Sequence, residues 1–368
     1  MKKNFIIISI IILIIILILV LFYNLPSILG MITSDIKEVN ESGLELNIKP
    51  ISDTDNGFIN LEKASLSLYV PTQATGTTRI INELYSSNNI DIKLAQDIVT
   101  KNNQAILEFS LAAEKSEFQN PAYNDLLNVS LEMPLPKLNN WRTISHISSI
   151  KAQILLSQGK NAEAMAEAIK SVKVGQLITD SNVSLIEYLV GIAIKNTGLD
   201  SVEKIISKSN FNKAELTSYS NELSKMYDSK KGLASAFIIE HKMREATINQ
   251  LISLLNDKED FMYNFSEESK NLSKINIKNF YYYRPNETKQ LDANYTREQI
   301  KNLNISCDNL KNIRGLEKLT PNNFITFYLT ENVIGKVTQD SIRSSLDSVY
   351  QNRCDTDAHL SKVISLLN

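Results

Sequence analysis

The hydrophobic pattern of the chain begins with an almost unbroken apolar run near the N-terminus. From Phe5 to Tyr23 only Ser9 is polar. A helix of about 20 residues spans the roughly 30 Å hydrocarbon core of a bilayer. The run is longer than the apolar core of a cleavable secretion signal, and no Ala-x-Ala cleavage pattern follows it. We therefore predict that residues 5–25 form a transmembrane anchor that stays attached, behind a short cytoplasmic tail of residues 1–4.

Charge predicts the orientation of this anchor. Positively charged residues beside a spanning segment tend to stay in the cytoplasm, so Lys2 and Lys3 predict a cytoplasmic N-terminus and a C-terminal body outside the cytoplasm. The next most apolar stretch, residues 183–194, is too short to cross a bilayer and contains Glu187 and Tyr188, which is typical of a helix buried in protein. We expect a single-pass protein of the cytoplasmic membrane.

Beyond the anchor, Pro, Gly and Asp residues punctuate residues 26–60, which predicts a linker that leads into a domain over residues 61–368. From about residue 90, apolar side chains recur every three or four positions, the spacing of amphipathic helices. Period-two alternation is scarce and best at Leu44–Ile48. The pattern predicts an all-α domain of antiparallel helical hairpins, arranged as a bundle or an irregular α-solenoid. The apolar stripes include Trp141, Ile144, Ile147, Ile150 and Ile154; Met165, Ile169 and Val172; Leu216, Tyr219, Leu223 and Met226; and Leu233, Phe237, Ile248, Leu251 and Leu255.

Short polar or glycine-containing segments are expected to separate these helices. Gly159 follows the first stripe, and the Asp180–Asn182 segment precedes the buried stretch. Gly198 and Asp200 predict a further boundary, because Glu203 stands three residues after Asp200, as in a capping box. The buried stretch and the residues after it should therefore form two helices.

Residues 257–320 differ from the rest of the body. Asn and Ser replace the apolar stripes, and the helical spacing resumes only near Pro321. This predicts an irregular segment, which either packs on the helical body or forms a mobile lobe.

Residues 152–171 have the pattern of a closely packed helical hairpin. Small residues and a central glycine recur at Gly159, Ala164 and Ala168, after Leu155 and around Glu163. The stretch is similar to the helix-turn-helix of a tetratricopeptide repeat. No second copy follows at the 34-residue spacing of such an array, so one tetratricopeptide-like hairpin is predicted.

Three segments together resemble a group of uncharacterised bacterial proteins. They are the block Trp141–Ile206, the Arg-Pro-Asn-Glu-Thr segment at Arg284–Thr288 and the Asn-Val-Ile-Gly-Lys segment at Asn332–Lys336. Members of the group look like N-terminally anchored, mostly helical exported proteins. The resemblance implies the topology and fold predicted above, and the inner membrane of a bacterium as the location. It implies no activity.

Composition removes several functional classes. A net charge of −2 is not that of a dedicated nucleic-acid binder, and two cysteines cannot form a disulfide scaffold. None of the three histidines lies in a His-Glu-x-x-His pattern, and no Cys-x-x-Cys pair occurs. Phosphate-binding glycine loops and the Gly-x-Ser-x-Gly elbow are also missing from the sequence. We expect no metal and no cofactor, and the sequence favours a protein that is not an enzyme.

One polar group interrupts the apolar stripe of residues 233–255. If Leu233 and Phe237 face the core, then Glu240, His241 and Arg244 lie on or beside the same face. A carboxylate, an imidazole and a guanidinium gathered at a pocket support acid–base work or anion binding. The alternative is a polar patch whose hydrogen bonds are satisfied at the edge of the stripe.

Tyr281, Tyr282, Tyr283 and Arg284 form the second candidate. Tyrosine and arginine are favoured at binding hot spots, so the run is a candidate platform for a protein partner. The alternative is that the rings pack on the domain and hold an irregular segment in place.

Cys307 and Cys354 are the third candidate. In an oxidising compartment they form a disulfide, which in the chain-entropy model is worth about 4 kcal/mol for a loop of roughly this length. Two free thiols are the alternative.

The functional expectation follows from the anchor and the absence of catalytic motifs. We expect a membrane-anchored extracytoplasmic scaffold or interaction module, held through residues 5–25, with a protein as partner and without nucleic-acid binding. An anchored enzyme such as a hydrolase, or a small-ligand sensor, remains as an alternative that uses the polar group on residues 233–255.

Overall fold

Helices form every regular element in the described part of this computed structural model, which confirms the all-α prediction. The described residues are 2–70, 77–87, 90–125, 133–227, 230–256, 281–312, 318–321, 323, 326–327, 329–343 and 347–368. Within them, the side chains of residues 2–11, 26–27, 77–78, 250–256, 310–312, 342–343 and 347 are not described. Leu44–Ile48, the best candidate for a strand, forms none.

The chain divides into two units, where the sequence suggested one domain over residues 61–368. Unit 1 consists of Met1–Leu44, Arg244–Glu298 and Ile313–Asp347, and unit 2 of Glu45–Met243, Gln299–Asn312 and Ser348–Asn368. Unit 2 contains α2 (Gly57–Ser67), α3 (Thr77–Ser86), α4 (Ile92–Lys101), α5 (Asn103–Ala112), α6 (Leu138–Ser157), α7 (Asn161–Thr179), α8 (Leu185–Lys208) and α9 (Lys213–Leu223), with the 3-10 helices η1 (Pro121–Asn124) and η5 (Cys307–Asn312). Unit 1 contains α1 (Lys2–Ile32) and α14 (Val333–Arg343). The boundaries between the units fall within α10 (Lys231–Asn256), α12 (Pro285–Asn302) and α15 (Asp347–Leu367).

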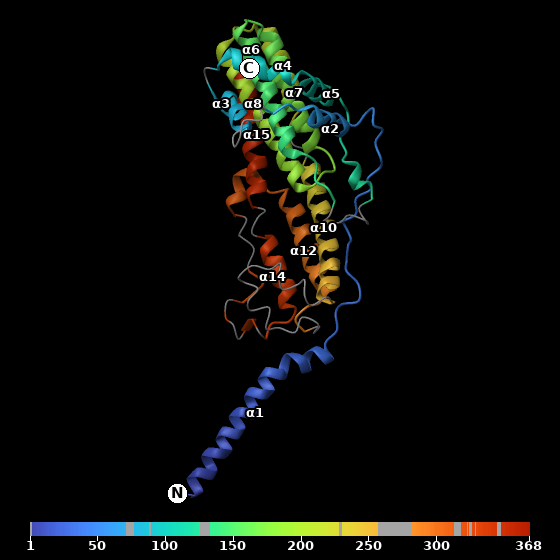
Figure 1. The fold of residues 1–368 in the computed structure, drawn as a ribbon, viewed down its shortest axis with the longest axis vertical. Coiled ribbons are helices and arrows are strands. Elements are labelled where there is room, and N and C mark those ends of the chain that lie inside the picture. The colour runs from blue at the N-terminus through green and yellow to red at the C-terminus, as the bar shows by residue number, and fades with distance from the viewer. Residues whose placement is uncertain are drawn as a thin grey trace. The chain divides into compact units, whose positions relative to one another are not determined.

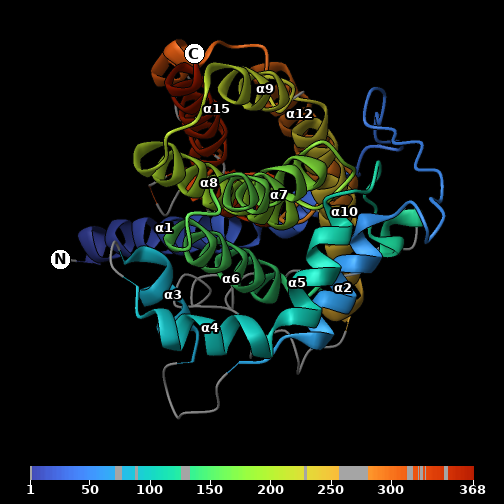
Figure 2. The same cartoon turned by 90° about the horizontal axis from the view of Figure 1, so that it is seen from above.

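The centre of unit 2 is built from α6, α7 and α8, which lie side by side in both Figure 1 and Figure 2. The predicted stripe on α6 is its buried face, since Trp141, Ile144, Ile147 and Ile150 are fully buried. The chain turns between α6 and α7 at Gly159, whose φ of 74° favours glycine. α6 and α7 therefore form a helical hairpin, and α3 and α4 pack along α6.

The predicted boundary at Gly198 and Asp200 is wrong, because α8 continues through both residues. Gly198 instead allows α7 and α8 to approach closely: a Cβ atom there would lie 2.6 Å from the backbone nitrogen of Val172. Gly175 plays the same part on α7, where a Cβ atom would lie 2.5 Å from the nitrogen of Lys195. In this protein, a glycine within an apolar helical stripe thus marks a close contact between two helices and not the end of a helix.

Unit 1 is held by polar contacts between segments that are far apart in the sequence. The Asp35 carboxylate accepts hydrogen bonds from the backbone nitrogens of Asn286 at 2.6 Å and Glu287 at 2.9 Å, and so satisfies the first turn of α12. Arg297 of α12 donates to the backbone oxygens of Asn40 and Ser42. Part of the segment expected to be a linker, residues 26–60, is therefore fixed on α12, and α2 begins within that segment.

The segment predicted to be irregular, residues 257–320, contains the whole of α12. Residues 257–280 and 313–317 of it lie outside the described residues. Pro285 occupies the first position of α12, where its fixed φ suits a helix start. The helix lacks an apolar stripe because its buried side chains include Asp292 and Thr296, which explains why hydrophobic spacing did not predict it.

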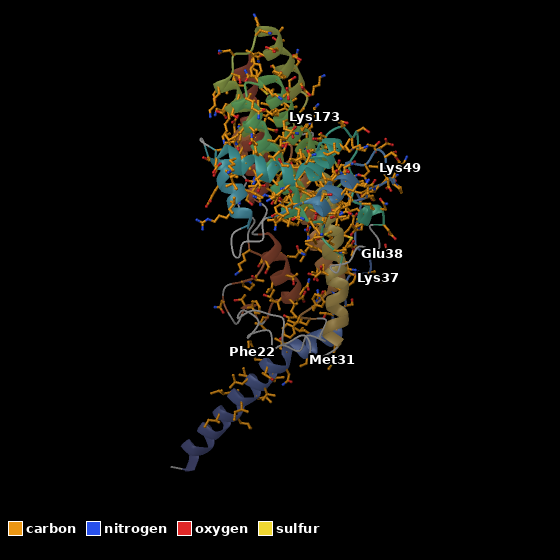
Figure 3. The ribbon with its side chains drawn as sticks, turned by 45° about the horizontal axis from the view of Figure 1, so that its top comes forward. Phe22, Met31, Lys37, Glu38, Lys49 and Lys173 are labelled. Atoms are coloured by element: carbon orange, nitrogen blue, oxygen red, sulfur yellow. A yellow bond between two sulfur atoms is a disulfide. The ribbon has the colours of Figure 1, made fainter. Side chains whose placement is uncertain are left out.

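α1 covers the predicted anchor and ends at Ile32. Its apolar side chains from Ile12 to Phe22 are 38–68% exposed, and Met31 is 84% exposed. Phe22 and Met31 are labelled in Figure 3. Among the residues described, no helix combines the length and the apolar character that a membrane crossing requires.

Candidate functional site

The polar group predicted on α10 has structural partners in each unit. In unit 2, the Glu240 carboxylate accepts a hydrogen bond from the backbone nitrogen of Leu185 at 3.1 Å, at the first turn of α8. His241 is fully buried. In unit 1, Arg244 pairs with the fully buried Asp292 at 2.7 Å and donates to Thr296 at 3.1 Å. These contacts match the alternative of a satisfied polar patch.

The tyrosine run lies in the core of unit 1. Tyr281, Tyr282 and Tyr283 are 3–5% exposed and pack with Ile248 of α10 and Val333 of α14. Rings buried to this extent hold the unit together and present little surface to a partner.

Asn332 joins the two short segments that carried the family resemblance. Its backbone nitrogen donates to the oxygen of Tyr281, and its side-chain oxygen accepts from the backbone nitrogen of Arg284 at 2.9 Å. Its φ of 50° lies in the left-handed region that Asn tolerates better than most residues. Gly335 approaches Thr288 so closely that a Cβ atom would overlap the hydroxyl.

Cys307 and Cys354 form a disulfide within unit 2, between η5 and α15, with their Cα atoms 5.7 Å apart. The chain leaves unit 2 after Asn312 and returns at Ser348. The disulfide therefore joins the two parts of unit 2 that lie on either side of residues 313–347, which belong to unit 1.

A polar cavity of about 600 Å³ in unit 2 gathers charged side chains from three helices. We call it the α3–α6–α8 cavity. Its walls are Arg79, Asn82, Glu83, Tyr85 and Ser86 of α3, Arg142 and His146 of α6, and Ala193, Asn196, Thr197 and Asp200 of α8. The helical hairpins place these side chains together, since α3 packs on α6 and α6 on α8.

His146 is held in one orientation at this cavity. Its ring stacks on the Tyr85 ring with centroids 4.4 Å apart, and its Nδ1 lies 2.9 Å from the side-chain oxygen of Asn82. With that oxygen as acceptor, Nδ1 carries the proton and Nε2 keeps a free lone pair. Burial, with the Arg142 charge added, lowers the pKa of His146 to about 4, against the weaker opposing effect of Asp200.

Asp200 is the anionic group of the cavity that links α8 to its neighbours. It accepts a hydrogen bond from the Tyr85 hydroxyl at 2.8 Å, and His359 of α15 lies 3.8 Å from its other oxygen. Burial, followed by the charge of Asp200, raises the pKa of the Tyr85 hydroxyl far above its ordinary value. The hydroxyl therefore stays protonated and acts as a donor to Asp200.

Two groups at the cavity lack partners among the described residues. Arg142 is exposed and makes no hydrogen bond or ion pair there, whereas Arg79 is paired with Glu83 at 2.6 Å. The side-chain oxygen of Asn196 is buried without a donor, although its nitrogen donates to Thr356 at 2.9 Å. The exposed Arg142 guanidinium can pair with an anionic group of a ligand, whereas the Asn196 oxygen has no accessible surface and does not face the open cavity.

A second cavity of unit 2, of about 450 Å³, is lined by three lysines, but two of these have structural partners. Lys115 donates to the backbone oxygen of Thr54 at 2.6 Å, and Lys173 pairs with Glu222 at 2.6 Å. The α3–α6–α8 cavity is therefore the stronger candidate for binding.

Sequence reasoning missed this cavity. Tyr85, His146 and Asp200 are separated by more than fifty residues each, and no motif connects them. The one local signal is the i,i+4 spacing of Arg142 and His146 on the flank of the buried α6 stripe.

The chain's similarity to known proteins supplies no assignment for the cavity. Comparisons with protein-family models, with curated proteins and with solved structures found no match. The functional conclusion therefore depends on the geometry of this chain alone.

Proposed function

We propose that this protein is a single-pass membrane-anchored interaction module whose helical body works outside the cytoplasm. In this proposal residues 5–25, within α1, lie in the membrane, with Lys2 and Lys3 on the cytoplasmic side. The body presents the α3–α6–α8 cavity to a partner or ligand.

The observation that carries the proposal is the disulfide between Cys307 and Cys354. These are the only cysteines of the chain, and structural disulfides persist in oxidising compartments outside the cytoplasm. Closing a loop of this length is worth about 4 kcal/mol in the chain-entropy model. A cytoplasmic body would lose this contribution, because cytoplasmic thiols are kept reduced.

α1 supports the anchor through its composition and exposure. Its apolar side chains from Ile12 to Leu25 lie open, which is costly in water and favourable in a bilayer. The low charge of the body, in turn, gives it no general attraction for anionic lipid.

The hairpin of α6 and α7, continued by α8, supports a tetratricopeptide-like arrangement for the body. Gly175 and Gly198 allow close helix contact, as small residues do in such repeats. We propose this arrangement for α6–α8 alone, since one hairpin pattern occurs in the sequence.

A fractionation and protease experiment on the full chain tests the proposal. Expressed in a bacterium, the chain should stay in the membrane pellet after an alkaline carbonate wash. Protease added to spheroplasts should digest the body. A matched variant without residues 5–25 should be soluble and protected from the protease. Release of the full chain by carbonate, or protection of its body, would contradict the proposal.

A small-ligand sensor is the second candidate, because the α3–α6–α8 cavity leaves the Arg142 guanidinium without a partner among the described residues. The hydrolase alternative gains nothing from Glu240, whose carboxylate is bonded to the first turn of α8. The hydrolase alternative predicts that replacing Glu240 and His241 by Ala removes a measurable hydrolytic activity.

A further inference from the structure

The hydrogen-bond donor and the acceptors at the α3–α6–α8 cavity lie at different positions along it. The donor without a partner is the Arg142 guanidinium. Acceptors lie further along: Nε2 of His146 and the Asp200 carboxylate. A ligand that satisfies both sets carries an anionic acceptor at one end and several donors at the other.

The helices separate the two charged groups along the cavity. α6 and α8 run in the same direction, because each is antiparallel to α7 between them in the chain. The hydroxyls of Ser149 and Ser201 lie 2.7 Å apart, which puts these two residues at the same level. Arg142 precedes Ser149 by two helical turns, and Asp200 is beside Ser201, so the charged residues lie about 10 Å apart along the helix axes.

This spacing indicates the size of the ligand. An extended peptide covers about 3.3–3.6 Å per residue, so three residues span about 10 Å. A single amino acid is too short, unless both side chains bend towards it.

The charge balance argues against simple ions. Arg79 and Glu83 neutralise each other, so Arg142 and Asp200 decide the balance. Asp200 repels a free phosphate or carboxylate, and Arg142 repels a metal cation. A zwitterion with separated ends meets a favourable charge at each end.

We propose that the α3–α6–α8 cavity binds a short peptide by both its free termini, with the carboxylate at Arg142 and the ammonium at Asp200. Ala193 is the small side chain of α8 in this wall and leaves room for the peptide. The inference rests on the proposed interaction module and gives its ligand class.

Calorimetric titration of the purified full chain in detergent tests the inference with three matched probes. Trialanine offers both termini, N-acetyl-trialanine lacks the ammonium, and trialanine amide lacks the carboxylate. We expect trialanine to bind with a submillimolar dissociation constant, and each blocked peptide to bind at least about tenfold more weakly, the size of one lost charge-assisted contact.

Two variants assign the ends of the peptide. Arg142→Gln should bind trialanine and its amide equally, and Asp200→Asn should bind trialanine and its N-acetyl form equally. Arg142 is exposed, and Asn at position 200 can still accept from Tyr85, so both variants should fold. Lys213→Gln removes an exposed positive charge on α9, outside the cavity, and should leave all three affinities unchanged.

Three results would overturn the inference: no binding of trialanine at millimolar concentration, equal binding of a blocked peptide, or equal binding of acetate or inorganic phosphate. The titration does not depend on where the protein resides in the cell. Its failure is therefore distinct from failure of the membrane and protease experiment.

Discussion

Units 1 and 2 are stabilised in different ways. Unit 2 is built on apolar stripes that follow one another in the sequence, with glycines where α7 meets α8. Both units collect three segments of the chain, but unit 2 takes most of its residues from Glu45–Met243. In unit 1, polar contacts such as Asn286 to Asp35 and Arg284 to Asn332 connect the segments, and Arg244 and Asp292 form a buried ion pair within one of them. Apolar periodicity is a local property of a sequence, whereas the partner of a buried carboxylate is not. The helices of unit 2 can therefore be predicted from the sequence pattern, whereas the polar contacts of unit 1 require the three-dimensional structure.

The largest expected effect is in unit 1. Arg244→Met should cost about 3–5 kcal/mol, because the fully buried Asp292 loses its cation. Hydrogen exchange of α12 amides measures the change. Arg79→Met in unit 2 is the matched control: its pair with Glu83 is 79% and 59% exposed, so its loss should leave the stability of the unit nearly unchanged. Equal effects of the two variants would contradict the comparison.

The next effect is a pH dependence of unit 2. The pKa of His146 is about 4 in the folded chain and 6.5 in its ordinary state. Between these values the unfolded chain binds a proton that the folded chain does not, so stability falls as pH decreases from 6.5 to 4. The loss is up to about 3 kcal/mol.

Denaturant unfolding at a series of pH values from 7 to 4 measures this loss. Hydrogen exchange of the α6 amides reports it locally. The variant His146→Gln should lose less stability than the original chain over that interval, because Gln does not titrate. Arg142 and Asp200 are the charged groups whose effects on His146 are included in this shift. Parallel curves for the two proteins would show that His146 is not held neutral.

A smaller effect tests the apolar contact of α7 with α8. Gly175→Ala places a Cβ atom 2.5 Å from the nitrogen of Lys195 and 2.6 Å from the oxygen of Gly191, so the helices must separate. We expect a loss of about 2 kcal/mol, measured by thermal unfolding. Ala166→Gly, at an exposed position of α7, measures the helix-propensity difference between the same two residues alone. A stabilised Gly175→Ala variant would show that the two helices are not in close contact.

The smallest effect concerns the end of α12. Asp35→Ala should cost unit 1 about 1 kcal/mol, because the backbone nitrogens of Asn286 and Glu287 lose their acceptor. Asp35→Asn keeps one side-chain oxygen and should lose less. Exchange rates of these two amides report the change directly, and unchanged rates in both variants would exclude the cap.

Particular residues show how far the sequence predicts this protein. The α6 stripe from Trp141 to Ile154 is buried as expected, because its spacing matches the helix period. Gly198 was misread because glycine serves both helix ends and close contacts, and only the position of Val172 distinguishes the two. α12 was missed because most of its buried positions, such as Thr288, Asp292 and Thr296, are polar.

For the candidate sites, too, the sequence indicates single residues but not their contacts. Cys307 and Cys354 were named from composition, but their pairing depends on a distance of 5.7 Å that no spacing supplies. Tyr85, His146 and Asp200 meet only after three helices pack, so the sequence could offer Arg142 and His146 at most.

The thiol state of Cys307 and Cys354 in living cells tests the central claim most directly. Acid quenching of growing cells, followed by alkylation with a maleimide of high mass, separates free from bonded thiols on a gel. An extracytoplasmic body predicts that the full chain gains no mass unless it is first reduced, and that Cys307→Ser gains one label without reduction. Two labels on the unreduced full chain would place the body in a reducing compartment and contradict the account.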